Sequence, residues 1–456
     1  MPVLVAGVVL SAALSGALLG YSSPLGPMLL GALVFAMFVV VVVESPIVGF
    51  FTLAAIIGLV PELTRDDRLL GLTPVVFREV ASGVTPMVVV LALLAAVLAF
   101  GVDTSRQWWP GPPATLALVL LVVALANVVW FSPFLQGLLI ARPLVILLVA
   151  TLVGYWTALR YGPDLPLKAL VVAGMLAIPA GLYNTAAGDI SYYDASFIYP
   201  LGMAATLVFF RVVDVGMLRV PFLVLSVLVI GLSLRRGATI VVAVAFLVAA
   251  LYFSRGGVRT TLAVLLGAVI VAELAVPDLA ISRLEMLAGY FSGTEGERAV
   301  DARHWESANA WINVREHWFT GIGPTANWTL YDTSGGLFRP SDNVRHYLHN
   351  SYQWVWLRYS LVGLVVFVAF LAVTARTLLR RGVPAVALIV GGSIVGLGIA
   401  LVTASFMTTT TRWPLTVGLY LGVALAALHL ARRAEGGMSE FGTPAGGVAA
   451  PVSTTV

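Results

Sequence analysis

The sequence predicts an all-α, polytopic integral membrane protein with about 12–14 transmembrane helices and one large extracytoplasmic loop that contains short amphipathic helices. Two of the observations are compositional: 60% of the 456 residues are hydrophobic, and only 11% are charged. Ordinary soluble domains contain roughly 45–50% apolar and roughly 25% charged residues, so one soluble core could not bury this excess. The third observation is that apolar runs long enough to cross a bilayer follow one another along the chain. This pattern excludes a soluble enzyme, a disordered chain, a nucleic-acid-binding module and an outer-membrane barrel, whose strands would alternate in polarity.

About fourteen segments have the length and composition of membrane helices. The first, Val3 to Gly20, has no basic residue before it, which favours a membrane helix over a cleavable secretory signal. The pairs of segments around Glu44 and Gly237 are short enough to form hairpins that do not fully cross. The segments are 3–20, 27–43, 45–61, 84–101, 114–130, 143–159, 167–184, 197–213, 218–234, 238–254, 260–277, 351–373, 383–403 and 414–431.

Basic residues give the orientation, because short cytoplasmic loops are enriched in Lys and Arg. Counting all of these helices places both termini in the cytoplasm and divides the chain into four parts. These are a first transmembrane bundle (1–277), an extracytoplasmic loop (278–350), the last membrane helices (351–431) and a disordered cytoplasmic tail (432–456). The connections expected on the cytoplasmic side contain Arg160 and Lys168, Arg211 and Arg219, Arg255 and Arg259, Arg376 with Arg380 and Arg381, and Arg432 with Arg433.

The outer loop carries four of the five histidines, and residues 301–319 within it have the pattern of an amphipathic helix. We expect Asp301 to cap this helix and a stripe through Trp305, Ala308, Ile312, Arg315 and Phe319 to form its apolar face. Tryptophans on such a helix are typical of the membrane interface. The same helix could also roof a cavity that opens to the bilayer. The four histidines are His304, His317, His346 and His349.

The segment 343–352 lies at the mouth of the next membrane helix, and three interpretations of its histidines compete. His346 and His349 are three residues apart and would share a helical face. They could be an interfacial pair, a metal site with Asp342, or the source of a general base, since an unperturbed histidine titrates near pH 6.5. An isolated H-x-x-H pair is a weak metal signal.

Arg235 and Arg236 fall between two membrane helices on the outer side, against the positive-inside pattern. Adjacent arginines at helix ends either snorkel to the interface or hold an anion such as a diphosphate. Arg142 is another outer-side arginine with a similar but weaker case.

Several short motifs, in order, resemble the O-antigen ligase and polymerase superfamily. They are Ser-Leu-Arg-Arg-Gly-Ala238, His317-Trp-Phe-Thr-Gly-Ile-Gly-Pro324, His349-Asn350-Ser-Tyr352 and Ser360-Leu-Val-Gly-Leu364. The resemblance covers about 230–365 by motif and the whole chain only by topology. It implies a GT-C-like, metal-independent membrane glycosyltransferase without a cofactor, which takes a glycan from a polyprenyl-diphosphate carrier on the outer face of the bacterial cytoplasmic membrane.

By this resemblance His349 is the base, and Arg236, with Arg235 beside it, binds the diphosphate, to which we add Arg142. Departures from the family at Phe319, Thr320 and Arg358, the last where the family commonly has a carboxylate, bear on acceptor contacts. Residues expected to bind substrate or support the loop are Arg303, Trp305, His317, Arg345, His346, Asn350 and Tyr352.

Three alternatives stay open at this point. A ligase passes the glycan to lipid A-core or another acceptor, whereas a polymerase passes it to another carrier-linked glycan. A lipid-linked oligosaccharide flippase would need charged residues at mid-membrane depth, but the polar residues gather at the outer rim. A metal-dependent transferase could use Asp66 and Asp67, although T-R-D-D-R is more typical of a solvated salt-bridge cluster. The expected partners are a lipid-linked donor, a lipid or glycan acceptor and the bilayer, with no nucleic acid.

The predicted orientation is testable with reporter tags. Tags after Val456 and within 376–382 should be cytoplasmic, because the arginine-rich connections lie there, and a tag at Gly335 should be outside. Accessibility of each tag to a membrane-impermeant label in whole cells measures this. A cytoplasmic signal from the tag at Gly335 would overturn the placement of every candidate site residue.

Overall fold

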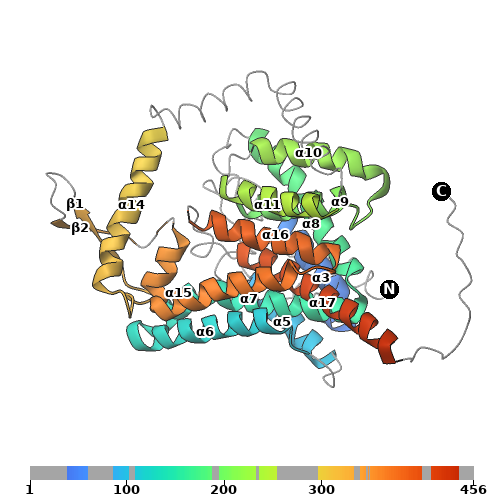
Figure 1. Ribbon diagram of the computed structural model, residues 1–456, viewed down its shortest axis with the longest axis horizontal. Helices are drawn as coiled ribbons and strands as arrows, with labels where there is room; N and C mark the ends of the chain where they lie inside the picture. Colours follow the sequence, from blue (N-terminus) through green and yellow to red (C-terminus); the bar gives the residue numbers. More distant parts are fainter. Residues whose placement is uncertain are drawn as a thin grey trace, which may run out of the picture.

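The computed structural model describes residues 39–59, 86–101, 108–186, 195–232, 236–253, 296–332, 339–345, 348, 350–402 and 412–440. These residues form a bundle of apolar helices, with one further helix and a small sheet at one end (Figure 1). The bundle consists of α3 (Pro46–Leu59), α5 (Pro86–Gly101), α6 (Pro112–Phe131), α7 (Phe134–Tyr161), α8 (Asp164–Ala186), α9 (Ala195–Phe209), the short η2 (Gly216–Leu218), α10 (Arg219–Leu232), α11 (Arg236–Phe253), α15 (Ser351–Leu378), α16 (Ala385–Ala400) and α17 (Arg412–Glu440).

The predicted membrane segments that fall within these residues all coincide with helices, so the largely helical fold class is confirmed. Among the described residues, α6, α7, α15 and the Arg412–Glu435 part of α17 are long and apolar enough to cross a membrane. Six further apolar helices are shorter, from 10 to 17 residues. The predicted segments 3–20 and 260–277, and most of 27–43, lie outside the described residues. The expected total of about 12–14 spans therefore stays a prediction.

The connection between α6 and α7 differs from the expectation. The sequence predicts the second helix of this pair at 143–159, with Arg142 in the preceding connection. The structure starts α7 at Phe134, directly after Ser132 and Pro133, so Arg142 lies inside the helix. Pro133 is the N-cap of α7, before the first helical residue, where its missing N–H costs no helical hydrogen bond. The apolar residues after Pro133 therefore extend the helix.

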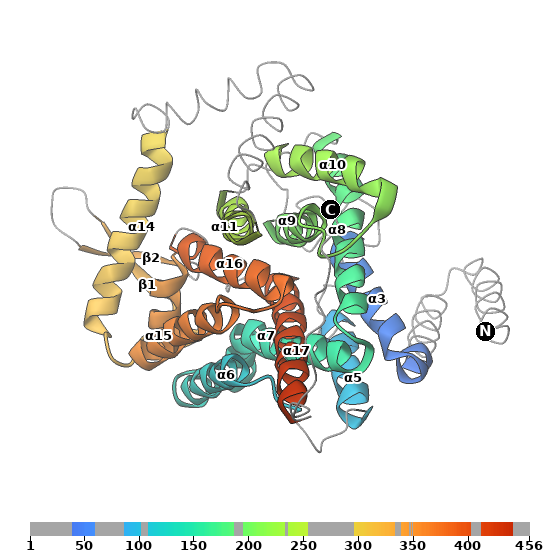
Figure 2. The same ribbon diagram turned by 45° about the vertical axis from the view of Figure 1, so that its right-hand side comes forward.

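Helices α7 and α17 pack along one another at the centre of the bundle (Figure 2). Glycines allow the close approach: a Cβ at Gly154 would lie 2.5 Å from the carbonyl oxygen of Leu419, and one at Gly418 would lie 2.7 Å from that of Leu147. Gly422 likewise faces the backbone of Thr151. Small residues at the contact let two membrane helices gain van der Waals packing, which replaces the missing hydrophobic driving force in lipid.

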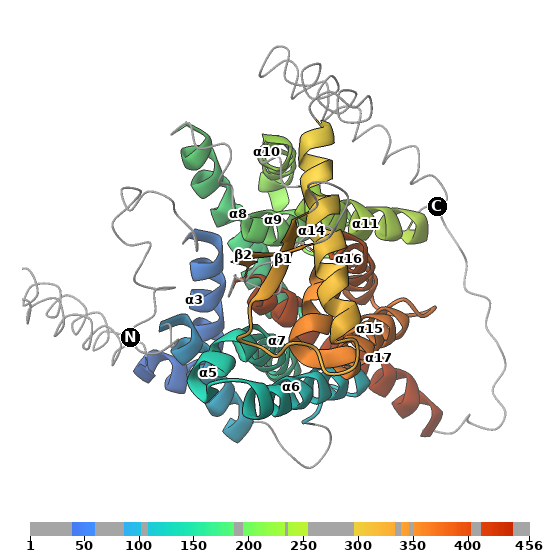
Figure 3. The same cartoon turned by 90° about the vertical axis from the view of Figure 1, so that its left-hand side faces the viewer.

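Outside the bundle, α14 (Gly296–Glu316) lies across its end and is followed by β1 (Trp328–Asp332) and β2 (Arg339–Arg345) (Figure 3). The two strands pair antiparallel, with Trp328 opposite Arg345 and a register shift between Thr329 and Tyr331. The sequence predicted helices alone for this loop. The strands are short and mostly polar, so they lack the regular alternation by which a half-buried strand is recognised.

The helix predicted at 301–319 is confirmed in kind, but its boundaries and buried face differ. It starts before Asp301 and ends at Glu316, and the predicted apolar stripe is largely exposed. The buried face is instead partly polar, with exposed fractions from 0% to 4%. Its members, spaced by three or four residues as one helical face requires, are Glu306, Asn309, Ala310, Asn313 and Val314. Asn313 explains the shift: its Nδ2 donates to Thr329 O (2.9 Å) and its Oδ1 accepts from Thr329 N (3.1 Å), so the polar face binds β1.

Replacing Gly418 with alanine should destabilise the protein by roughly 1–3 kcal/mol, because the added methyl group overpacks the α7–α17 contact. Gly398→Ala is the matched control, since a Cβ there meets only the hydroxyl of Tyr352, at 3.6 Å. The control should be neutral or stabilising, because alanine favours the helix. Thermal unfolding in detergent measures both, and equal midpoints for the two variants would contradict the tight contact.

Candidate functional site at one end of the bundle

The segment that leads into α15 is fixed at the end of the bundle where α16 stops. Asn350 caps α15: its Oδ1 accepts from Tyr352 N (3.0 Å) and Gln353 N (3.1 Å), as expected of an N-cap side chain. The Ser351 amide donates to Leu401 O (2.9 Å), and the Tyr352 hydroxyl donates to Gly398 O (2.6 Å). Of these two predicted site or support residues, Asn350 thus caps α15 and Tyr352 holds the start of α15 against α16.

Two arginines lie at helix starts at this same end. Arg236 is the first residue of α11, which runs antiparallel to α16, since Gly396 faces Val241 and Gly392 faces Val248. Arg412 is the first residue of α17 and is fully buried, with its guanidinium carbon 3.9 Å from the ring centroid of Phe197 at the start of α9. Cations over aromatic faces are attracted by the ring quadrupole, and this attraction is stronger away from water.

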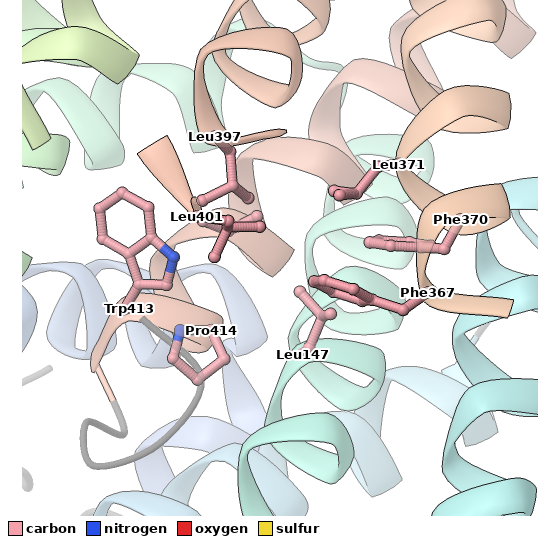
Figure 4. Close-up of a pocket in the computed structure, with 9 residues that line it drawn as sticks. Leu147, Phe367, Phe370, Leu371, Leu397, Leu401, Trp413 and Pro414 are labelled. Carbon is pink, nitrogen blue, oxygen red and sulfur yellow. The ribbon is translucent and has the colours of Figure 1, made fainter. Parts of the chain in front are cut away.

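Arg142 lies near the same end, in the early part of α7. Because α7 and α17 run in the same direction, Leu147 of α7 meets Pro414 and Val417 of α17. These residues line a narrow apolar pocket between α7, α15, α16 and α17 (Figure 4). The interior below the arginines is therefore hydrocarbon. Arg142, Arg236 and Arg412 all lie near this end of the bundle.

The next feature is a break in α15. Tyr359 and Ser360 depart from helical geometry, and Ser360 has φ 71° and ψ 175°. In an unbroken helix the Leu361 amide would donate to Leu357 O. Here it donates instead to Phe319 O (3.2 Å), and Leu357 O accepts from Ile322 N (2.7 Å) and Gly323 N (3.3 Å). Residues 319–326, which we call the docking loop, thus insert into the helical hydrogen-bond ladder.

The docking loop fits the break because of its two glycines. Gly321 and Gly323 have φ of 69° and 93°, a region that favours glycine. A Cβ at Gly321 would also lie 2.5 Å from Leu357 O, and one at Gly323 would lie 2.7 Å from Phe131 Cβ at the end of α6. This is the physical reason for the G-I-G part of the motif.

The loop is also bound by side chains. Arg358, only 3% exposed, donates through Nη1 to the carbonyl oxygens of Gly323 (3.4 Å), Pro324 (2.6 Å) and Ala326. The Thr325 amide donates to Ser132 Oγ (3.3 Å) in the α6–α7 turn. Arg358 therefore holds this loop, and the expectation that its departure from the family bears on acceptor contacts stays a prediction.

The structure brings together some of the predicted site residues. The starts of α11 and α15 lie near the end of α16, and Trp305 and His317 lie on α14 and in the turn that follows it. His349, His346 and Arg235 lie outside the described residues. Arg303 and Arg345 lie on α14 and β2, and Arg236 opens α11. The alternative metal residues Asp66 and Asp67 also lie outside, so metal independence stays a prediction.

Sequence reasoning missed two features of this end of the bundle. Arg412 was not among the predicted site residues, although it is a charged residue directly before the predicted membrane segment 414–431. Arg358 was noted only as a departure from a family, although a charge inside a predicted membrane segment signals a specific role. That second signal was available from the sequence alone.

These features are those of a multi-pass membrane protein with a folded segment held against one end of its helices. Residues 221–368, from α10 to the middle of α15, match the family model described as O-antigen ligase. No curated protein matches the chain. The match contains the arginine pair, α14, the docking loop and the start of α15, and it confirms the resemblance indicated by the motifs. The match over this part of the chain supports membership of the O-antigen ligase and polymerase superfamily.

Ser360→Gly should stabilise the protein by about 1 kcal/mol, because a side chain in this backbone region costs about 1–3 kcal/mol. Glycine relieves that strain but loses some chain entropy on folding. Ala372→Gly, at an exposed helical position of α15, is the control and should destabilise by a similar amount. Thermal midpoints in detergent compare the two, and a lower midpoint for Ser360→Gly would show that its conformation is not strained.

Proposed function

We propose that this protein is a glycosyltransferase of the bacterial cytoplasmic membrane that transfers a glycan from a polyprenyl-diphosphate carrier to an acceptor hydroxyl on the outer face. One observation carries the proposal. The family-matched segment 221–368 contains both Arg236, at the first residue of α11, and Asn350, which caps α15, and these two helix starts adjoin the end of α16.

The chemistry needs two kinds of group. The acceptor oxygen forms a bond to the anomeric carbon of the donor glycan while the bond from that carbon to the diphosphate oxygen breaks. Negative charge then grows on the departing carrier diphosphate, and fixed cations in a water-poor site stabilise it most effectively. The acceptor hydroxyl loses its proton to a base. In the proposal, Arg235, Arg236 and Arg142 supply the cations, and His349 takes the proton.

The described surroundings support this division. Leu348, 1% exposed, and the N-cap Asn350 lie on either side of position 349, so both neighbours of the proposed base are fixed. Arginine suits the diphosphate because its planar fork matches phosphate oxygens. The apolar bundle below this end favours contact with a polyprenyl chain rather than with a soluble nucleotide sugar.

We infer the ligase reaction as the first candidate and the polymerase reaction as its alternative, since the motifs are shared. The test is reconstitution of the purified protein in liposomes with a defined polyprenyl-diphosphate glycan and separate lipid and glycan acceptors. The product mass distinguishes a glycan moved to a new acceptor from a lengthened carrier-linked glycan. Absence of both products would contradict the proposal.

Substitutions should separate the two roles. His349→Ala should lower transfer by about 10²–10⁴-fold, the usual contribution of a positioned base, while donor binding survives. Arg236→Ala should weaken both donor binding and turnover, and Arg236→Lys should recover only part, because lysine is a point charge. Single-turnover transfer and equilibrium donor binding measure these effects.

Arg380→Ala, an exposed arginine between α15 and α16, is the control and should behave like the native protein. Full activity of His349→Ala would sink the base assignment. Intact donor binding and turnover in an Arg235/Arg236 double alanine variant would sink the diphosphate assignment.

A further inference from the structure

A buried arginine inside a membrane-spanning segment needs a reason. Arg358 lies seven residues after the start of α15, about 10 Å along the helix axis at 1.5 Å per residue. It is 3% exposed. Burying a guanidinium is costly unless its donors find acceptors, and here the acceptors include three backbone carbonyls of one loop, at 323, 324 and 326.

Those carbonyls belong to the docking loop, which attaches the α14–β1–β2 segment to the bundle. Before the loop lies α14, and after it lies β1, which Asn313 of α14 binds. Strand β2, which pairs with β1, ends at Arg345, and Asn350 caps α15 five residues later. In the sequence, position 349 therefore lies between the α14–β1–β2 segment and the helix that contains Arg358.

Other hydrogen bonds also attach the loop to the bundle. Its backbone bonds to Leu357 and Leu361, and Thr325 N bonds Ser132 Oγ. The Trp356 indole donates to Trp318 O (2.5 Å) just before the loop, at a site partly open to solvent. Arg358 binds the later part of the loop, from Gly323 to Ala326, in a buried site where each bond is strong.

We propose that Arg358 is a positioning residue that fixes the α14–β1–β2 segment on the membrane bundle, and so holds the acceptor-side base in register with the arginines that bind the donor. The functional half of this inference rests on the proposed transferase activity. The geometric half does not depend on that activity. A misplacement of about 1 Å in an active site can cost on the order of 10²-fold in rate, which is the effect expected here.

The geometric half is tested by a distance measurement. The chain has no cysteine, so spin labels at Ala126→Cys on α6 and Ala308→Cys on α14, both exposed, report without background. The native protein and the Arg376→Met control, an exposed arginine at the other end of α15, should give one narrow distribution of distances. Arg358→Met, which keeps an unbranched apolar side chain but has no donor, should give a broad or shifted distribution. A distribution as narrow and centred as the native one would overturn the inference, whatever the reaction.

The functional half is tested by kinetics on the same proteins. Arg358→Met should lower turnover on the order of 10²-fold with donor affinity unchanged. Arg358→Lys should recover part of the turnover, because the ammonium keeps the charge and the donors but lacks the reach and the planar geometry of the guanidinium. If Arg358→Met fails to fold, Arg358→Lys alone decides: reduced turnover with native donor affinity supports the role, and native turnover overturns it. Loss of donor affinity in either folded variant would place Arg358 at the diphosphate and would also overturn it.

The two proposals fail separately. If the native protein transfers no glycan but Arg358→Met broadens the distance distribution, the proposed function falls and the positioning role of Arg358 stands. If the native protein is active and Arg358→Met matches it in turnover and in distance, the positioning role of Arg358 falls and the proposed function stands.

Discussion

The arrangement at the end of the bundle depends on how one membrane helix is broken. A gap in the hydrogen-bond ladder of α15 leaves backbone groups that lipid cannot satisfy, so such a gap is tolerated only where protein fills it. The docking loop fills the gap, because its backbone forms hydrogen bonds with the Leu357 carbonyl and the Leu361 amide, which no longer bond to each other. Two glycines at positive φ let the loop approach closely, and Arg358 pairs with its remaining carbonyls. The break and the loop therefore require each other, and neither would be stable alone.

The sequence predicted the helices well, because about 20 consecutive apolar residues leave the chain little choice in a bilayer. The sequence predicted the buried faces and the exact boundaries of helices less well, because these depend on which partners the side chains contact. The apolar stripe of α14 was read from hydrophobicity, whereas the buried face is set by Asn313 pairing with the backbone of Thr329. The start of α7 was placed at Pro143 when the earlier Pro133 decides it. Such outcomes depend on partners far away in sequence, which periodicity does not record.

The candidate site was predictable in its motifs and less so in the physical role of each residue. The motifs predict Asn350 and Tyr352 as substrate or support residues, and in the structure their hydrogen bonds are those of a helix cap and a helix–helix contact. Arg358 illustrates the opposite case, since a departure from a family pattern marks a specific structural task. The role of a buried arginine therefore has to be inferred from the groups that accept its hydrogen bonds. Three carbonyls of one loop and a diphosphate both satisfy a guanidinium, and only their positions distinguish them.

The division between loop and bundle also explains why the proposed chemistry can be both rigid and open to lipid. The bundle side is apolar and closely packed, with glycines between α7 and α17 and aliphatic side chains below the arginines. Where α14 leads into the docking loop, Trp318 and Phe319 remain more than half exposed. Aromatic side chains of this kind are stable at a membrane interface. A lipid-linked substrate could thus approach from the bilayer beside the docking loop, while the hydrogen bonds of Arg358 and the broken helix keep the two halves of the site in register.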